Sequence, residues 1–245
     1  MIFKFPKKKI VLDCFTYYDH ILTTAPIVPA MKLIPEWWKN LPNYFYDEHS
    51  KTERSTMRHC AGMVDYYKTS IVIPLWSDLL IDIKSCNQYK WSYSDGMSRA
   101  FNHDITNQAT GFLNNYAHVK LETPWAFKTK ENIKWVWSHP TYSFPNSHNI
   151  VSLPGVVNYF EQRSTNINLL FFAEKEIKIL IPQNHPMVHI TPMSDRKVEI
   201  VRHLISKQEF GRLSSAATDI TFKQKYETIK KRQKQFENCP YHNKT

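Results

Sequence analysis

The chain has 245 residues, of which 42% are hydrophobic and 14% aromatic, so it can bury a sizeable core and is not a generally disordered protein. Its formal charge of +10 favours an anionic or acidic partner or, more simply, an unevenly charged solvated surface. No window of about 18 apolar residues occurs, which excludes a membrane-spanning helix.

The cysteines and the N-terminal run indicate the compartment. The basic N-terminal run lacks an apolar stretch of signal-peptide length. The four cysteines fit neither a zinc-binding nor a disulfide pattern, so they predict free thiols in a reducing compartment. They are Cys14, Cys60, Cys86 and Cys239.

Residues 1–60 contain many prolines and are predicted to form an irregular segment that wraps the rest of the chain. Within it, IPEWWKNLP (34–42) predicts one or two helical turns, because Pro35 suits a helix start and Pro42 ends it. Trp37 and Trp38 then lie about 100° apart around the helix, so one can be buried while the other lies at the rim. Both are candidate binding residues, and Trp38 is a candidate contact residue if it is exposed, because tryptophan is enriched in binding hot spots.

From about residue 69 to residue 193 the sequence predicts a series of short β-strands. The segment 69–84 ends in an alternating pattern and contains Pro74, which predicts a bulged or edge strand, or two strands. The segment 89–94 is its predicted hairpin partner. Further strands are expected in 117–129, 132–140, 149–160, 167–174 and 177–193. This spacing predicts a mainly β fold, either a two-sheet sandwich or a jelly-roll-like barrel.

After residue 194 the composition changes, and 196–213 and 218–238 are predicted to be helices. The second helix has one apolar stripe, and its other faces are basic, with Lys230, Lys231 and Arg232 among them. These residues either face solvent or dock on a partner or an anionic surface. The expected organisation is therefore a β-rich domain over residues 1–193 and a helical extension over residues 194–245.

No motif of a known catalytic site is assembled in the sequence, and no cofactor is predicted. GxSxG, P-loop and GxGxxG patterns are absent. A metal-dependent, oxygenase-like enzyme on a double-stranded β-helix is an alternative. Its ligands would be His103, Asp104 and one of His139, His148, His185 or His189. His185 and His189 would lie roughly 13 Å apart on a strand, too far to share an ion, which favours ordinary strand surface or core polarity for both.

The sequence contains two further candidate binding features, a set of polar residues and a pattern of alternating aromatic and basic residues. The first is a possible polar cluster, whose convergence in space would mark a site: Thr56, Cys60, Asp65, Asp78, His103 and Gln108. The second is the interleaving of aromatic and basic residues, as in YKWSYS (89–94), which is typical of ordinary sheets and also of platforms that stack nucleic-acid bases. Single-stranded nucleic-acid binding is therefore a second alternative.

Several motifs occur in a fixed order: IPEWWKNLP (34–42), IPLWSD (73–78), TPWAFKTK (123–130), LPGVVNYF (153–160) and ILIPQNHPMVHITPM (179–193). The series resembles a family of tailed-phage proteins, especially of marine and cyanobacterial phages, and of some bacteria, over residues 30–193. The family has no settled activity, so the resemblance implies a phage-type β protein and no reaction. The chain departs from the family at His185, where a glycine is expected, and at Asn158, where an aspartate is expected.

Together these features favour a non-enzymatic protein that acts through protein–protein contacts, as a virion or tail-associated structural component. Its expected partners are other protein subunits in a homo- or hetero-oligomer. Its expected location is the host cytoplasm or the virion.

Overall fold

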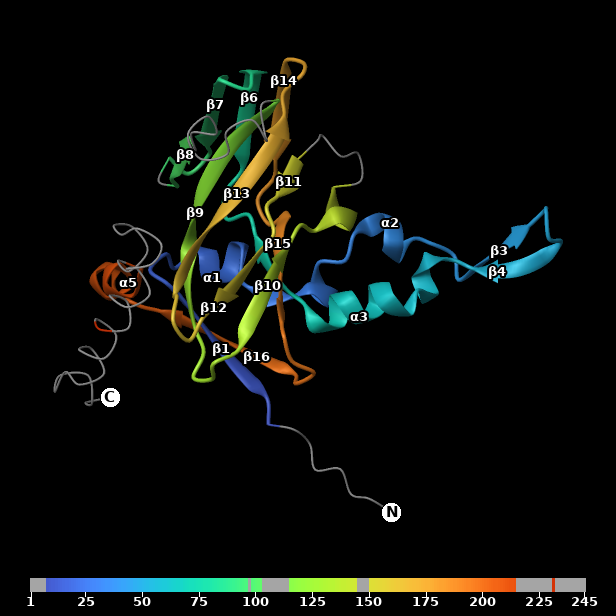
Figure 1. Cartoon of the computed structure of the whole chain (residues 1–245), viewed down its shortest axis with the longest axis horizontal. Coiled ribbons are helices and arrows are strands. Elements are labelled where there is room, and N and C mark those ends of the chain that lie inside the picture. The colour runs from blue at the N-terminus through green and yellow to red at the C-terminus, as the bar shows by residue number, and fades with distance from the viewer. Residues whose placement is uncertain (1–7, 97, 103–114, 145–149, 215–230, 232–245) are drawn as a thin grey trace.

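The computed structural model describes residues 8–96, 98–102, 115–144, 150–214 and 231. This part is built mainly of strands, which form three packed sheets and one projecting hairpin (Figure 1). The predicted mainly β sandwich is confirmed. The strand order in each described sheet has two ends, so these sheets do not close into a barrel.

The largest sheet has six strands in the order β11-β13-β9-β1-β16, with β8 paired to β9 off this path. Its pairings are antiparallel except for that of β1 with β16, which run parallel. The strands are β1 (Ile10–Thr16), β8 (Ala100–Asn102), β9 (Tyr116–Lys128), β11 (Ile150–Ser152), β13 (Ser164–Phe172) and β16 (Val198–Leu204).

Two antiparallel sheets complete the β body, one with the order β12-β10-β15-β5-β2 and one with the order β14-β6-β7. Their strands are β2 (Val28–Pro29), β5 (Ile71–Pro74), β6 (Leu79–Ser85), β7 (Gln88–Tyr93), β10 (Lys134–Ser138), β12 (Gly155–Asn158), β14 (Ile177–Ile181) and β15 (Pro186–Pro192).

The helices are short and lie around the sheets (Figure 1). They are α1 (Ile21–Thr24), α2 (Glu36–Lys39), α3 (Ala61–Thr69) and α5 (Lys207–Ser214), with single 3₁₀ turns at Ala30–Lys32, Met57–His59 and Thr141–Ser143. The hairpin consists of β3 (Tyr44–Asp47) and β4 (Thr52–Ser55).

The main core lies between the sheets. Strands such as β1 contribute every second side chain to it, whereas β5 is buried along its whole length. In β1, Ile10, Leu12 and Cys14 are fully buried, while the residues between them are partly exposed. Trp135 of β10 and Ile190 of β15 belong to the same core. This burial with a period of two on facing sheets is what a sandwich requires.

The predicted strands between residues 69 and 193 are present. The segment 69–84 forms two strands, since β5 ends at Pro74 and β6 begins at Leu79. β7 pairs with β6 as the expected hairpin partner. The three cysteines in the described residues are free thiols, as predicted. Cys14 is a core residue, and its burial raises the pKa of its thiol.

Two predictions about the ends of the chain are wrong. Residues 10–16, expected to be irregular, form β1 in the interior of the six-stranded sheet. The helix expected over 196–213 begins only at Lys207, because residues 198–204 pair with β1 as β16. Strands on both sides of the expected boundary at 193/194 therefore contribute to the sheets. Apart from residue 231, the helix expected over 218–238 lies outside the described residues.

The tryptophan pair anchors the N-terminal segment, as expected. Trp38 is buried in a second, smaller core, where its ring lies 5.1 Å from that of Tyr67 on α3. Trp37 is half-buried and donates a hydrogen bond of 2.9 Å to the carbonyl oxygen of Tyr142. Trp38 is therefore the anchor of the pair. Because its side chain is buried, little of its surface is accessible to a binding partner.

We expect Trp38→Ala to lower the free energy of unfolding by about 3–5 kcal/mol, because the substitution leaves a cavity between α2 and α3. The matched variant Trp37→Ala removes a half-buried ring and should cost only about 1 kcal/mol. Equilibrium chemical denaturation followed by circular dichroism measures both values. Equal losses in the two variants would contradict the assignment of Trp38 as the anchor.

Candidate functional site

The hairpin projects away from the β body, and we call residues 43–56 the arm (Figure 1). Three consecutive aromatic residues lie on its first strand: Tyr44 is 57% exposed, Phe45 48% and Tyr46 55%. Because successive side chains of a strand point to opposite faces, both faces of the arm carry an exposed aromatic ring. The sequence analysis did not identify these residues.

The tip of the arm is held by polar contacts. The Asp47 carboxylate accepts hydrogen bonds from the backbone N–H of His49 at 3.0 Å and from the hydroxyl of Ser50 at 2.8 Å. The hydroxyl bond, followed by the backbone bond, lowers the pKa of Asp47. Arg54 on the second strand pairs with the same carboxylate at 2.9 Å. The two strands are thus joined by side chains as well as by the backbone ladder.

The base of the arm is closed by Thr56, a member of the predicted polar set. Its hydroxyl donates to the carbonyl oxygen of Pro42 at 2.6 Å and accepts from the backbone N–H of Arg58 at 3.2 Å. The Arg58 guanidinium donates to the carbonyl oxygens of Lys39 and Leu41, at 3.2 and 2.8 Å. Thr56 therefore has a structural role at this position.

The other described members of the polar set lie in different surroundings. Cys60 is exposed just before α3, and Asp65 is exposed on that helix. Asp78 accepts a hydrogen bond of 2.7 Å from the backbone N–H of Gln183, near the start of β6. None of the four described members is hydrogen-bonded to another. His103 and Gln108 lie outside the described residues.

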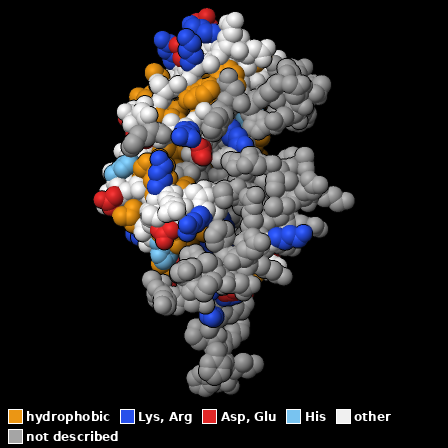
Figure 2. Space-filling view, turned by 90° about the vertical axis from the view of Figure 1, so that its left-hand side faces the viewer, with side chains coloured by type: hydrophobic (Ala, Val, Ile, Leu, Met, Phe, Trp, Pro, Cys, Tyr) orange, Lys and Arg blue, Asp and Glu red, His pale blue; other side chains and the backbone are white. Residues whose placement is uncertain are grey.

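The candidate basic residues of the C-terminal segment are mostly not described either. Lys231 is an exposed helical residue, and Lys230 and Arg232 lie outside the described part of the chain. On the face that Figure 2 shows, the coloured Lys and Arg side chains are scattered among hydrophobic and acidic ones and do not gather into one patch.

Three histidines named for the enzyme alternative lie near one another. The Phe144 ring links two of them, with its centre 5.0 Å from that of His139 and 4.3 Å from that of His185. His189 on β15 is fully buried and stacks on Tyr66 at 4.9 Å. His103, Asp104 and His148 lie outside the described residues.

Protonation of this histidine group is unfavourable. Burial, with a smaller contribution from the nearby His139, lowers the pKa of both His185 and His189 to about 4. His139 accepts a hydrogen bond from the backbone N–H of Ser152 through Nδ1, so its own proton is on Nε2. Among the described residues no group of three or more His, Cys, Asp or Glu side chains is arranged to hold a metal ion.

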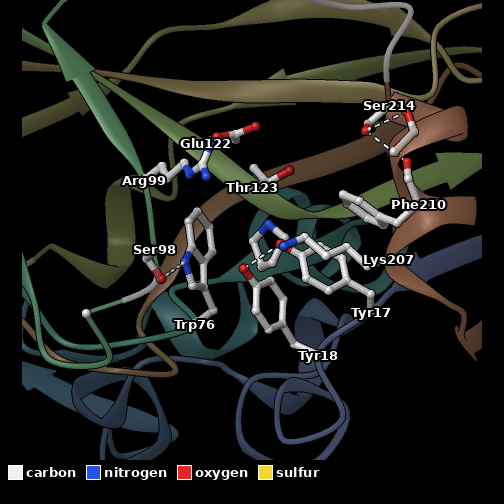
Figure 3. A pocket seen from close by; sticks show the side chains of 13 residues that line it. Tyr17, Tyr18, Trp76, Ser98, Arg99, Glu122, Thr123, Lys207, Phe210 and Ser214 are labelled. Carbon is white, nitrogen blue, oxygen red and sulfur yellow. Dashed lines mark hydrogen bonds between the residues drawn. The ribbon is translucent and has the colours of Figure 1, made fainter.

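A cleft of about 710 Å³ lies beside α5 (Figure 3). This helix is on the opposite side of the β body from the arm (Figure 1). One wall consists of Tyr17, which follows β1, and Phe210 of α5, with ring centres 4.9 Å apart. Tyr18 lies beside them, its ring centre 4.0 Å from that of Tyr17, and the two hydroxyls are hydrogen-bonded at 2.5 Å. Burial, followed by this bond, raises the pKa of Tyr18. Tyr18 is thus a neutral donor and acceptor at neutral pH.

The other wall is formed by Trp76 and the loop before β8. The indole N–H of Trp76 donates to the Ser98 hydroxyl at 2.9 Å, and this hydroxyl donates to the Asp95 carboxylate at 2.5 Å. Arg99 follows Ser98, and its guanidinium faces the cleft near Glu122 of β9 (Figure 3). These bonds hold Ser98, the residue before Arg99, at the cleft.

The helix α5 presents one face to the cleft. Lys207, Phe210, Gly211 and Ser214 have the spacing of one helical face and all line the cleft. The helix starts with a capping box, in which the side chains of Ser206 and Glu209 bond each other's backbone N–H groups at 3.2 and 2.9 Å. This S-x-x-E pattern was the sequence signal that could have placed the helix start correctly.

Comparisons with known proteins identify no relative of the chain. No protein-family model matches the chain, and no match was found among curated proteins or solved structures. Within the described residues, no helix is long and apolar enough to cross a membrane.

We expect stability to depend on pH through His189. An unfolded histidine takes up its proton near pH 6.5, whereas the folded residue does so near pH 4. The free energy of unfolding should therefore fall as the pH drops from 6.5 to 4, by about 3 kcal/mol for this residue. His189→Leu should remove that part of the fall, as measured by chemical denaturation at about pH 7 and pH 4.5. The control His49→Gln, on the exposed arm tip, should leave it unchanged, and an unaltered fall in His189→Leu would contradict the assignment.

Proposed function

We propose that the protein acts by binding other protein subunits through its arm, as a structural component of a virion or tail assembly. The observation that carries the proposal is the run of exposed aromatic side chains on the arm. The setting rests on the resemblance of residues 30–193 to tailed-phage proteins. The expected partner is a second copy of this chain.

The arm has a physical reason to be covered. A two-stranded ribbon is marginally stable in water unless it packs against further structure. A fully covered aromatic side chain buries about 150–250 Å². At roughly 25 cal/mol per Å², covering the exposed half of one ring contributes about 2–3 kcal/mol. With Tyr44, Phe45 and Tyr46 about half exposed, the arm offers a contact surface of the aromatic type found at interface hot spots.

The charge distribution favours a second copy of the chain as the partner. Within the arm, three acidic residues (Asp47, Glu48 and Glu53) against two basic ones (Lys51 and Arg54) give a net charge of −1. The whole chain carries +10, so the rest of it carries +11. The arm of one copy is therefore opposite in sign to the body of another, which favours this part of the molecule as the point of contact, although two whole chains of +10 repel each other.

We expect the wild-type protein to form oligomers of defined order in native mass spectrometry and in light scattering after gel filtration. The double variant Phe45→Ser/Tyr46→Ser removes two exposed apolar side chains and should be monomeric at the same concentration. Because both residues lie on the exposed arm, the circular dichroism spectrum should not change.

The matched control is Leu80→Ser/Leu180→Ser, which removes two exposed apolar side chains paired across β6 and β14. It should keep the wild-type oligomeric state. Self-association through the arm would be refuted by a wild-type chain that is monomeric at its highest soluble concentration. It would also be refuted by oligomers that survive the arm substitutions. Monomers that bind a different subunit only when the arm is intact would replace the second copy by a hetero-partner.

A further inference from the structure

We propose that the cleft between β1, the loop before β8 and α5 binds a small molecule that carries a planar ring and an anionic group. This site is separate from the arm, so the inference does not rest on the proposed assembly function. Its volume of about 710 Å³ is in the range of pockets that bind small molecules and cofactors.

The position of the cleft in the fold is that of a binding site. β1 and β16 run parallel, so their carboxyl ends lie at the same edge of the sheet. Tyr17 and Tyr18 follow the first strand, and α5 follows the second. In open α/β sheets of parallel strands, ligands bind in the crevice outside the carboxyl ends. The sheet here is otherwise antiparallel among its described pairings, and β1 with β16 reproduces that arrangement locally. The cleft here lies between the segments that leave two such ends.

The aromatic side chains provide a place for a planar ring. Tyr17, Tyr18 and Phe210 form one contiguous aromatic wall, with neighbouring ring centres 4.0 and 4.9 Å apart. Trp76 lies on the opposite side, where its N–H is bonded to Ser98 and its side chain is almost fully buried, so it backs that side and exposes little of its own surface. A ring that enters beside the tyrosines would replace water on their exposed faces.

Two cations provide the place for the anionic group. Arg99 and Lys207 reach into the cleft from opposite walls (Figure 3). Neither forms an ion pair within the described part of the chain. Both are held on fixed backbone, the first by the bonds of Ser98 to Asp95 and the second by the capped start of α5. A carboxylate or phosphate bound between them would accept charge-assisted hydrogen bonds from both sides.

The carboxylate of Glu122 makes the cleft more selective for ligands that carry hydrogen-bond donors. Its exposed carboxylate lines the same space as the two cations, near Arg99 (Figure 3). A carboxylate can only accept hydrogen bonds, so a ring that carries N–H or O–H donors fits better than a bare hydrocarbon ring. Nucleoside monophosphates and aromatic carboxylates with ring donors share this chemistry, and the experiment distinguishes them.

The test uses isothermal titration calorimetry on the full chain, with intrinsic tryptophan fluorescence as a second readout. The probes are the four common nucleoside 5′-monophosphates, indole-3-carboxylate, 4-hydroxybenzoate and inorganic phosphate. At least one ring-bearing anion should bind, and more tightly than inorganic phosphate. The preferred class of probe identifies the source of the ligand. Arg99→Met and Lys207→Met should each weaken binding about tenfold or more, because one charge-assisted hydrogen bond is lost.

Gly211→Leu provides a blocking variant that should still fold. A Cβ atom added at Gly211 meets no atom within 4 Å, so the leucine side chain can occupy the cleft. Replacing a helical glycine also favours the helix. The matched control is Gly62→Leu on α3, where an added Cβ likewise meets nothing within 4 Å but the site is remote from the cleft. The first variant should abolish binding with an unchanged or higher Tm, and the second should bind as the wild type does.

Three results would overturn the proposal. The first is that no ring-bearing anion binds at millimolar concentration. The second is that Gly211→Leu binds as tightly as the wild type, which would place the ligand elsewhere. The third is that a single-stranded oligonucleotide binds with an affinity that increases with its length, which would assign the surface to nucleic acid. The arm variant Phe45→Ser/Tyr46→Ser should bind the probe normally, which keeps this test independent of the assembly function.

Discussion

The parallel pairing of β1 with β16 is the constraint on which both the six-stranded sheet and the cleft depend. It joins a segment near the N-terminus to one almost 190 residues later, in an unbroken register from Ile10 opposite Val198 to Thr16 opposite Leu204. The ladder continues beyond the strands, since the backbone N–H of Ile205 donates to the carbonyl oxygen of Thr16 at 2.9 Å. An antiparallel pairing would have sent α5 to the other edge of the sheet, away from Tyr17. The direction of one strand pair therefore decides that the cleft exists.

The alternation of hydrophobic and polar residues predicted the strands in the middle of the chain, but it did not predict β1 and β16. In β6 the alternation of buried and exposed residues is complete from Leu79 to Lys84, and the hairpin with β7 follows directly. In the segment 198–205, by contrast, Val198, Val201 and Ile205 also have the spacing of a helical face, so local pattern alone does not separate helix from strand. Pairing with β1 decides the outcome. Tertiary contacts commonly override a local preference in this way.

The sites were harder to predict than the fold, for reasons that differ between them. The aromatic run Tyr44–Tyr46 has the composition of a core strand, and only the placement of the hairpin shows that it is solvent-exposed. The cleft combines side chains from five separate stretches of chain, with no spacing that marks them in the sequence. The spacing of His185 and His189 was informative. It predicted that they are ordinary polar residues of a strand surface or core, and His189 is a buried residue of β15.

The histidines show how a sandwich core can tolerate polar side chains at a cost. Both ring nitrogens of His189 are buried and have no hydrogen-bond partner among the described residues, and an unpaired buried polar group is unfavourable. Stacking on Tyr66 and an edge contact with Tyr67 keep the ring in place in its neutral form. Tyr67 also packs on Trp38, so His189 and the tryptophan anchor both contact this tyrosine of the small core.

That shared core also determines how the arm is presented. The indole N–H of Trp38 donates to the carbonyl oxygen of Met57 at 3.2 Å, immediately after the second strand of the arm. Arg58 bonds the carbonyl oxygens of Lys39 and Leu41 on the other side of the same base. The chain just after the arm is therefore bonded to a buried ring, and the chain just before the arm is bonded to Arg58, although the arm itself is exposed. A contact surface held in this way loses little conformational freedom when a partner covers it, so more of the burial free energy remains for binding. The buried Trp38 thus holds the base of the arm, and in this way it helps to fix the position in which Tyr44, Phe45 and Tyr46 are exposed.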